Sequence, residues 1–143
     1  MIIGIVGSEA AKFTPDTEAT ARQIIRDLLS PPDAVLCSGH CHLGGIDIYA
    51  EEEADRLGRQ KLIYPPTVLN WAQGYKPRNI QIARASDIVY CLTLRELPPS
   101  YNGMRFEGCY HCGDARPPHV KSGGCWTVWQ AMKLGKPGEW RII

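Results

Sequence analysis

Four residues between positions 109 and 125 have types and spacings suited to binding a metal ion. Cys109 and Cys112 form a Cys-x2-Cys pair that Gly113 follows, and His119 and Cys125 complete the pattern Cys-x2-Cys-x6-His-x5-Cys. A tight turn of this kind aims two thiolates at one ion, and two further ligands close a tetrahedral zinc site. We predict a structural zinc ion, because four protein ligands leave no open position for a substrate.

The Cys-x2-Cys pair leaves two alternatives open. A redox pair has the same spacing, but it normally lies at the start of a helix that follows a strand, whereas Gly113-Asp114 follows here. His111 is a second candidate ligand that could replace Cys125 or His119. Cys109 and Cys112 are therefore the best-defined ligands of the predicted site.

Glycine-rich turns form a second group of residues with a chemical use. Gly7-Ser8-Glu9 follows one apolar run, Ser38-Gly39 and Gly44-Gly45 follow a second, and Ser122-Gly123-Gly124 precedes a predicted helix. Glycine lets backbone amides approach an anion closely, and helix N-termini favour phosphate. The turns predict a phosphate or nucleotide site, although the sequence contains neither a lysine-containing phosphate loop nor a dinucleotide fingerprint.

Alternating strands and helices are predicted to position these turns. Apolar runs predict strands at 1–6, 34–37, 61–64, 88–92 and 140–143, and helical periodicity predicts helices at 15–29, 46–57, 77–85 and 126–134. Thr14 is the expected N-cap of the first helix, with Pro15 at its first position. Trp126 and Trp129 lie three residues apart on the last helix, which is typical of core packing.

This alternation predicts one α/β domain over residues 1–143. We expect a Rossmann-like three-layer sandwich, with helices on both faces of a parallel five-stranded sheet of order 3-2-1-4-5. Because the carboxyl ends of parallel strands share one edge, the glycine-rich turns should meet there. The proline-rich segment 95–122 interrupts the alternation, and we interpret it as an insertion before the last helix that the zinc ion staples.

Composition narrows the class of protein. The chain has 143 residues, of which 44% are hydrophobic and 22% charged, with a net charge of +1, so we expect a globular protein and not one that coats nucleic acid. Six cysteines without a secretory leader favour metal binding over disulfides. No apolar run reaches the roughly 18 residues that span a bilayer. We expect a cytoplasmic location without membrane attachment.

The arrangement resembles the SLOG superfamily, which includes the DprA/Smf domain, the LOG phosphoribohydrolases and small stand-alone proteins. The segments that carry the resemblance are Gly7-Ser8, the loop from Ser38 to Asp47, Arg78-Asn79 and Gly123-Gly124. The resemblance implies a Rossmann-like fold with a nucleotide-related ligand near these loops. The implied pocket residues are Gly7, Ser8, Ser38, Gly39, Gly44, Gly45, Asp47, Arg78, Asn79, Gly123 and Gly124, and Glu9 joins them from the first turn.

One departure from this resemblance bears on function. LOG enzymes carry a PGGxGTxxE motif with a catalytic glutamate, whereas residues 122–129 read SGGCWTVW. The leading hypothesis is therefore a sensing, sequestering or regulatory module that binds a nucleotide-like small molecule. One alternative is a LOG-like enzyme acting on an N-glycosidic or phosphate bond through Glu9, Asp47 or Glu51. Another is a DprA-like nucleic-acid-binding component that uses Arg105, Arg116 and Lys121. A homo-oligomer is an expectation by analogy.

Overall fold

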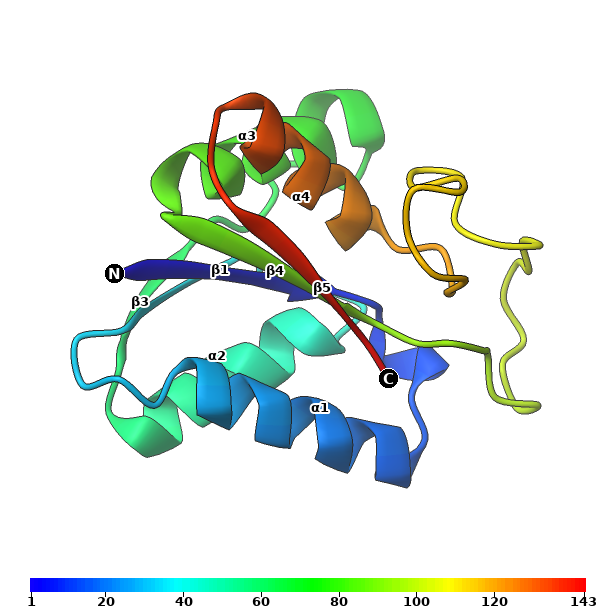
Figure 1. Ribbon diagram of the computed structural model, residues 1–143, viewed down its shortest axis with the longest axis horizontal. Coiled ribbons are helices and arrows are strands. Elements are labelled where there is room, and N and C mark those ends of the chain that lie inside the picture. The colour runs from blue at the N-terminus through cyan, green and yellow to red at the C-terminus, as the bar shows by residue number, and fades with distance from the viewer.

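The computed structural model describes residues 1–143, and a parallel sheet of five strands forms its centre (Figure 1). The strands are β1 (Ile2–Gly7), β2 (Val35–Ser38), β3 (Gln60–Ile63), β4 (Ile88–Thr93) and β5 (Gly138–Ile142). Their order is β3-β2-β1-β4-β5, and every neighbouring pair is parallel. The predicted Rossmann-like architecture and strand order are confirmed.

Helices cover both faces of the sheet. Helices α1 (Pro15–Leu28) and α2 (Ile46–Leu57) lie on one face, while α3 (Lys76–Ala85) and α4 (Gly123–Lys133) lie on the other (Figure 1). As predicted, Thr14 caps α1: its hydroxyl accepts from the Thr17 amide at 3.2 Å, and Thr17 Oγ1 accepts from the Thr14 amide at 2.8 Å. Gly58 ends α2 in the left-handed conformation, at a φ of 67°, which explains why glycine stands there.

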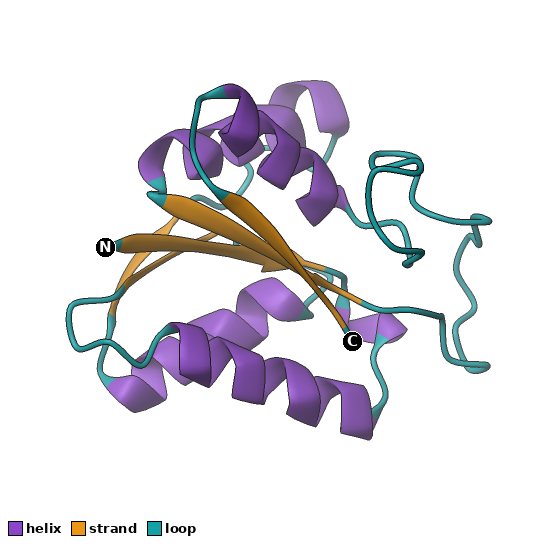
Figure 2. Cartoon of the chain, in the orientation of Figure 1, coloured by secondary structure: helices purple, strands orange, loops and turns teal.

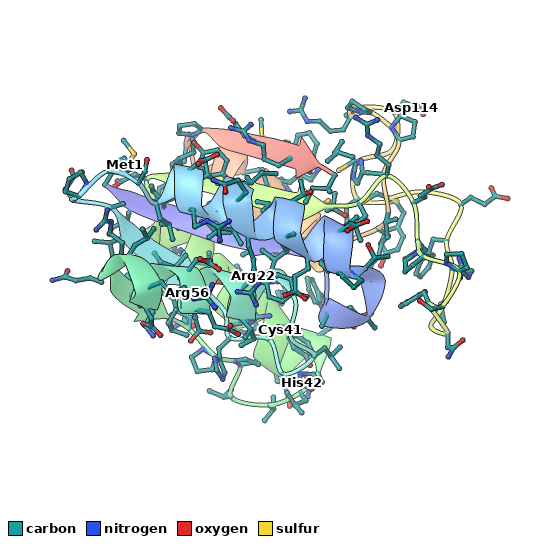
Figure 3. The ribbon with its side chains drawn as sticks, turned by 90° about the horizontal axis from the view of Figure 1, so that it is seen from below. Met1, Arg22, Cys41, His42, Arg56 and Asp114 are labelled. Carbon is teal, nitrogen blue, oxygen red and sulfur yellow. The ribbon has the colours of Figure 1, made fainter.

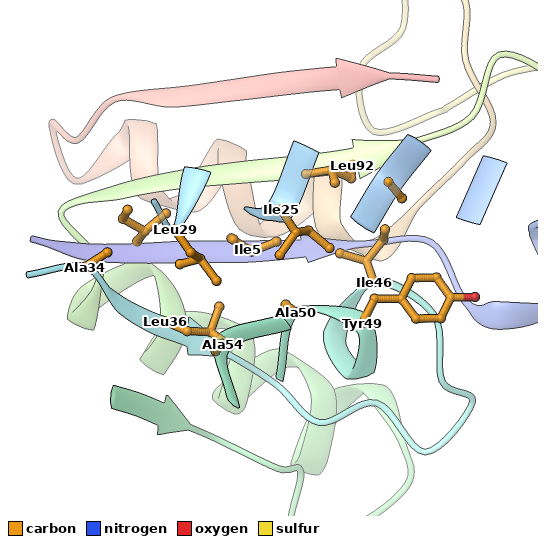
Figure 4. Close-up of a cluster of buried hydrophobic side chains, with 12 residues drawn as sticks. Ile5, Ile25, Leu29, Ala34, Leu36, Ile46, Tyr49, Ala50, Ala54 and Leu92 are labelled. Carbon is orange, nitrogen blue, oxygen red and sulfur yellow. The ribbon is translucent and has the colours of Figure 1, made fainter. Parts of the chain in front are cut away.

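Two buried clusters of apolar residues hold the layers together. One lies between the sheet and the pair α1–α2, and Figure 4 shows its side chains meeting around Ile5 and Ile25. The other lies on the opposite face and contains five of the six cysteines: Cys37, Cys91, Cys109, Cys112 and Cys125. The second core therefore continues directly into the predicted metal site.

Several boundaries differ from the sequence predictions. The last helix begins at Gly123, not at 126, because the Ser122 side chain caps it by accepting from the Gly124 amide at 3.1 Å. The segment before α3 forms a short π-helical turn, Trp71–Tyr75, that runs into the helix. The terminal strand occupies Gly138–Ile142, where a strand over 140–143 was expected.

The segment between β4 and α4 contains neither helix nor strand, and it extends as a long loop in Figure 2. Its ends are fixed to the sheet: the Val120 amide donates to the Leu94 carbonyl at 2.7 Å, and Thr93 Oγ1 donates to the Val120 carbonyl at 2.9 Å. Tyr101 donates from its hydroxyl to Glu9 Oε1 at 3.2 Å, which joins the middle of the loop to the end of β1. None of the helices combines the length and apolar character needed to cross a bilayer.

Candidate functional site

The structure brings together the four predicted metal ligands. One donor atom each from Cys109, Cys112, His119 and Cys125 lies within 4.8 Å of the other three, and all four residues are buried. In a tetrahedral site with Zn–S bonds of about 2.3 Å, neighbouring sulfurs lie about 3.8 Å apart. The donor atoms here lie within 4.8 Å of one another, and the one nitrogen–sulfur distance, from His119 Nε2 to Cys125 Sγ, is 3.5 Å. The donor set thus fits a metal of tetrahedral preference.

The groups around the cluster orient the ligands. His119 Nδ1 lies 2.7 Å from the Pro117 carbonyl, to which it donates when its proton is on Nδ1, and Nε2 is then free to bind a metal. The Trp140 indole donates to Cys125 Sγ at 3.4 Å. Burial, together with the neighbouring Cys125, raises the pKa of Cys112 to about 12. The thiolates of this site therefore need a cation to balance their charge.

The turn that carries the first two ligands is tight. Backbone amides of Cys112 and Gly113 both donate to the Cys109 carbonyl, at 3.2 and 3.0 Å. Gly113 adopts a φ of 53°, which a residue with a side chain rarely adopts. A further turn follows, so the helix expected after a redox pair is not formed. His111, the alternative ligand, lies outside the cluster and lines a neighbouring cavity.

Aromatic side chains pack residues 95–122, which carry three of the four cluster ligands and are called the metal segment below, against the rest of the domain. The Arg116 guanidinium lies 4.3 Å from the Trp140 ring centre and 5.4 Å from that of Trp129. The two indoles pack against each other at 4.9 Å. Trp129 thus serves in packing, as its spacing on the helix predicted. The metal segment is held from α4 and β5 at once.

A cavity of about 610 Å³ opens at the carboxyl edge of the sheet, next to the metal cluster. Loops after β1 and β2, the turn before α3, the start of α4 and the metal segment all contribute to its wall. The lining residues are Val6, Gly7, Ser8, Glu9, Lys12, Cys41, Leu43, Asp47, Trp71, Tyr75, Arg78, Asn79, Tyr110, His111, Lys121, Ser122, Gly123, Gly124, Trp126 and Thr127. Figure 3 labels Cys41, which belongs to the loop after β2.

Basic groups and a helix N-terminus lie together in the wall of this cavity, beside the carboxyl groups of Glu9 and Asp47. Lys12 and Lys121 both line it, and the Lys12 ammonium donates to the Lys121 carbonyl at 3.1 Å. Burial and the charge of Lys121 lower the pKa of Lys12, against the opposing charge of Glu9. The N-terminus of α4, with its positive dipole end, contributes Ser122, Gly123 and Gly124 to the same wall. An anion bound between these groups would relieve the repulsion between the two lysines.

Asp47 and Arg78 are two buried, oppositely charged residues on the cavity wall, and each has its own hydrogen-bond partners. Arg78 donates through its guanidinium to Asn79 Oδ1 and to the Gly39 carbonyl. Asp47 accepts from the Cys41 amide at 3.1 Å, and burial raises its pKa although the charge of Arg78 opposes this. A Cβ at Gly39 would lie 2.3 Å from Arg78 Nη1, so glycine there permits the arginine's approach.

The predicted binding residues fall into two groups. Eight line the cavity: Gly7, Ser8, Glu9, Asp47, Arg78, Asn79, Gly123 and Gly124. Four others, Ser38, Gly39, Gly44 and Gly45, support it from outside. Ser38 donates to the Ile5 carbonyl at 2.7 Å, while Gly45 precedes α2 with a φ of 82° and packs on the backbone of Ser8. A ligand-binding role for any of these residues stays a prediction.

Sequence reasoning missed the aromatic wall of the cavity. Trp71 and Tyr75 come from the π-helical turn, and Trp126 comes from α4, where core packing was expected. Tyr110, Lys12 and Lys121 were also not assigned to a small-molecule pocket. No periodic pattern marks the turn before α3, although three aromatic residues at 64, 71 and 75 were a compositional signal.

The three cations proposed for nucleic-acid contact do not form one free basic surface. Arg116 lies over Trp140, and Arg105 donates to the carbonyls of Pro98 and Tyr101 at 3.2 and 2.9 Å. Lys121 lines the cavity. Two of the three cations are thus engaged within the metal segment or against the strands, which favours the small-molecule hypothesis over the nucleic-acid one.

Comparisons with known proteins relate the fold, and only the fold, to solved structures. No protein-family model matches the sequence, and no curated protein matches it. A structure of the molybdenum cofactor carrier protein from Chlamydomonas reinhardtii superposes with a TM-score of 0.61 at 18% identity, covering 97% of this chain and 74% of that one. A second structure of the Chlamydomonas carrier protein has a TM-score of 0.59 at 15% identity, covering 99% and 76%. These matches support the Rossmann-like architecture, and the SLOG resemblance stays a prediction.

Proposed function

We propose that this protein is a binding module for a nucleotide or a nucleotide-derived small molecule, held in the cavity at the carboxyl edge of the sheet. The observation that carries the proposal is the combination of size and charge: about 610 Å³, lined by Lys12, Lys121, Arg78 and the start of α4. Cavities of roughly 300–1,000 Å³ suit ligands of this size. Basic groups beside a helix N-terminus suit a phosphate.

An unpaired hydroxyl in the same wall supports a ligand there. Thr127 is 1% exposed and lines the cavity, and its Oγ1 is buried without a hydrogen-bond partner in the chain. A buried polar group left without a partner costs about 1–3 kcal/mol. A ligand oxygen that accepts a hydrogen bond from this hydroxyl would recover that free energy. Thr127 lies on α4, the helix whose N-terminus also faces the cavity.

The proteins of similar structure also bind a small molecule, which is consistent with this proposal. Both are described as carriers of the molybdenum cofactor, a small molecule. At 18% and 15% identity they share the fold, and they do not identify the ligand of this chain. We therefore include the molybdenum cofactor among the ligands to be tested beside nucleotides.

We further propose that the Cys3His cluster holds one structural zinc ion. The support is the donor set: three buried thiols and one imidazole, each within 4.8 Å of the others. Four protein ligands of this chemistry close a tetrahedral site, so the ion would order the chain and not take part in a reaction. Binding by three thiolates requires them to lose their protons, which the ion's charge makes favourable.

The experiment is native mass spectrometry of protein purified without added metal, followed by thermal melts with a panel of nucleotides and the molybdenum cofactor. We expect one zinc ion per chain and, for the right ligand, a Tm that rises with ligand concentration. The same spectra report whether the chain forms a homo-oligomer. Protein without zinc would contradict the metal proposal, and a panel that leaves the Tm unchanged would contradict the ligand proposal.

A charge variant localises the binding. Lys12→Met should weaken binding of a phosphate-bearing ligand by about 10- to 150-fold, because one charge-assisted hydrogen bond is worth roughly 1.5–3 kcal/mol. Lys133→Met is the matched control, since Lys133 is exposed at the end of α4 and does not line the cavity. Equal losses in both variants would mean that net charge, and not this site, attracts the ligand.

A further inference from the structure

Trp71 and Trp126 form an aromatic corner in the cavity wall. Their ring centres lie 4.9 Å apart, and their planes are inclined by 83°, so one ring points its edge at the face of the other. In such a pair, the ring that gives its edge keeps both faces free of its partner. The ring that gives its face still keeps its opposite face, so in either arrangement Trp71 has at least one face that Trp126 does not cover.

The exposure of Trp71 is not explained by packing of the domain. Its side chain is 45% exposed, and it belongs to neither of the two buried apolar clusters. Its turn is nevertheless well fixed: Asn70 Oδ1 accepts from the Gln73 amide at 2.8 Å, and the Tyr75 amide donates to the Asn70 carbonyl at 2.9 Å. A fixed turn therefore presents a large indole to the cavity.

Tyr75, from the same turn, extends this aromatic wall toward the buried Arg78. The Arg78 guanidinium lies 5.6 Å from the Tyr75 ring centre, and Tyr75 Oη lies 3.3 Å from His42 Nδ1. These contacts engage the Tyr75 ring and hydroxyl within the protein. The indole of Trp71 has no such cation over it, so its face is the one that a ligand ring can use.

We propose that Trp71 is the ring-binding residue of the cavity, and that it selects ligands carrying a planar heteroaromatic ring. The ring stacks on the Trp71 indole, within the corner made with Trp126, while the anionic part of the ligand lies toward Lys12, Lys121 and the start of α4. This inference rests on the proposed function and adds to it that the ligand must contain a planar heteroaromatic ring. A sugar phosphate alone should bind much more weakly than a nucleotide.

The test compares ligands that contain both an aromatic ring and a phosphate with a ligand that contains the phosphate alone. Binding of adenosine 5′-monophosphate, guanosine 5′-monophosphate and ribose 5-phosphate is measured by calorimetry for the wild type, Trp71→Ala and Trp71→Phe. Stacking of one base on an aromatic side chain corresponds to roughly five- to a hundredfold in affinity. Trp71→Ala should weaken nucleotide binding by about tenfold and leave ribose 5-phosphate binding unchanged, and Trp71→Phe should retain most of the nucleotide affinity.

Leu69→Ala is the control for the surface change. Leu69 lies in the same segment, is 64% exposed and does not line the cavity, so its truncation should alter neither ligand's affinity. Trp71 is itself exposed, so thermal melts should show each variant folded. As an independent readout, nucleotide should quench indole fluorescence in the wild type and much less in Trp71→Phe.

The outcomes separate this inference from the proposed function. Nucleotide binding that Trp71→Ala leaves intact, or that falls by the same factor as ribose 5-phosphate binding, would overturn the ring subsite while the binding function stands. A wild type that binds neither the nucleotides nor ribose 5-phosphate would overturn both. A tenfold loss confined to nucleotides supports the assignment.

Discussion

Gly124 meets the backbone of Gly7 where the start of α4 closes on the end of β1. A Cβ at position 124 would lie 2.9 Å from the Gly7 nitrogen and 3.0 Å from Cys91 Sγ. We predict that Gly124→Ala lowers the free energy of unfolding by about 2 kcal/mol, because backbone atoms must move apart to admit the methyl group. Chemical denaturation measures this change.

Gly123→Ala is the matched control for this substitution. It changes the adjacent residue in the same first turn, but a Cβ there meets nothing within 4 Å. Alanine also favours a helix more than glycine does, by up to about 1 kcal/mol. Gly123→Ala should therefore be neutral or stabilising. Equal destabilisation by both variants would show that helix-start flexibility, and not the close approach to Gly7, explains the glycine.

Residue types and spacing predicted the metal cluster because thiols with this spacing have few other uses. The position of Trp71 could not be predicted in the same way. A tryptophan in an aperiodic turn has no helix face or strand face to place it, and its neighbour Trp126 lies on a helix whose pattern also suits core packing. What put both indoles on one cavity was the tertiary arrangement of η2, the turn Trp71–Tyr75, beside α4.

Between elements, a buried carboxylate links α1 to α2. Glu53 is 0% exposed, and it accepts hydrogen bonds from Arg22, Arg26 and Arg56 at 2.9–3.2 Å. Figure 3 views the molecule from this side and labels Arg22 and Arg56. Burial opposes ionisation of Glu53, but the hydrogen bonds of Arg22 and Arg26 and the charge of Arg56 outweigh it and lower its pKa.

We predict that Glu53→Gln lowers the free energy of unfolding at pH 7 by about 3 kcal/mol, because three guanidinium groups lose their shared partner. A lowered carboxyl pKa stabilises the fold fully above the unfolded value of 4.5, and this stabilisation is lost as the pH falls through the folded value. The difference between wild type and Glu53→Gln should therefore shrink below pH 4.5. Urea denaturation across this range measures it.

Glu52→Gln is the control for charge removal from the same helix. Glu52 is 45% exposed and has only Arg22 as a partner, at 3.3 Å. Exposed ion pairs contribute about 0.2–1 kcal/mol, so this variant should stay near the wild type. If the free energy of unfolding of Glu53→Gln stays below that of the wild type by the same amount at pH 7 and below pH 4.5, the pH dependence does not come from Glu53.

The positions of helices and strands were predicted well where an apolar pattern extends over many residues. They were predicted poorly where one side-chain hydrogen bond sets the boundary of the element. The Ile-rich run of β1 and the spacing of apolar residues in α1 fix these elements locally. The start of α4 depends on the Ser122 cap, which moves the helix boundary three residues earlier than its apolar pattern suggests. The cavity wall depends on that earlier turn, so the boundary error concealed how close the helix N-terminus lies to Lys12.

At the scale of the whole molecule, the metal segment and the cavity share a wall. Tyr110 and His111 lie within the cluster's turn, and Lys121 to Gly124 lie between two of its ligands. We predict that a chelator that removes the zinc ion proposed for the cluster weakens ligand binding at least tenfold. Bound ligand should in turn slow metal release, because coupling between two sites is reciprocal. Calorimetry on metal-free and metal-loaded protein measures the first effect.

The sheet should survive metal removal, since residues 95–122 contribute no helix or strand. Far-UV circular dichroism should change little, while proteolysis within the segment should accelerate. Cys112→Ser should mimic the chelator, and Cys41→Ser, which removes a thiol outside the cluster, should keep the metal. Metal-free protein that binds its ligand as tightly as the metal-loaded form would contradict the shared wall.

The central place of β1 bears on how the chain matures during synthesis. β1 pairs with β2 on one side, but its other partner is β4, with Ile3 opposite Ile88. Until β4 has been synthesised, one edge of the apolar strand β1 has no neighbour, and such an edge can pair with other chains. Domains generally fold as units, with pairings distant in sequence forming slowly. A chain that pauses before β4 has emerged from the ribosome should therefore aggregate more than one that pauses after β4 has emerged.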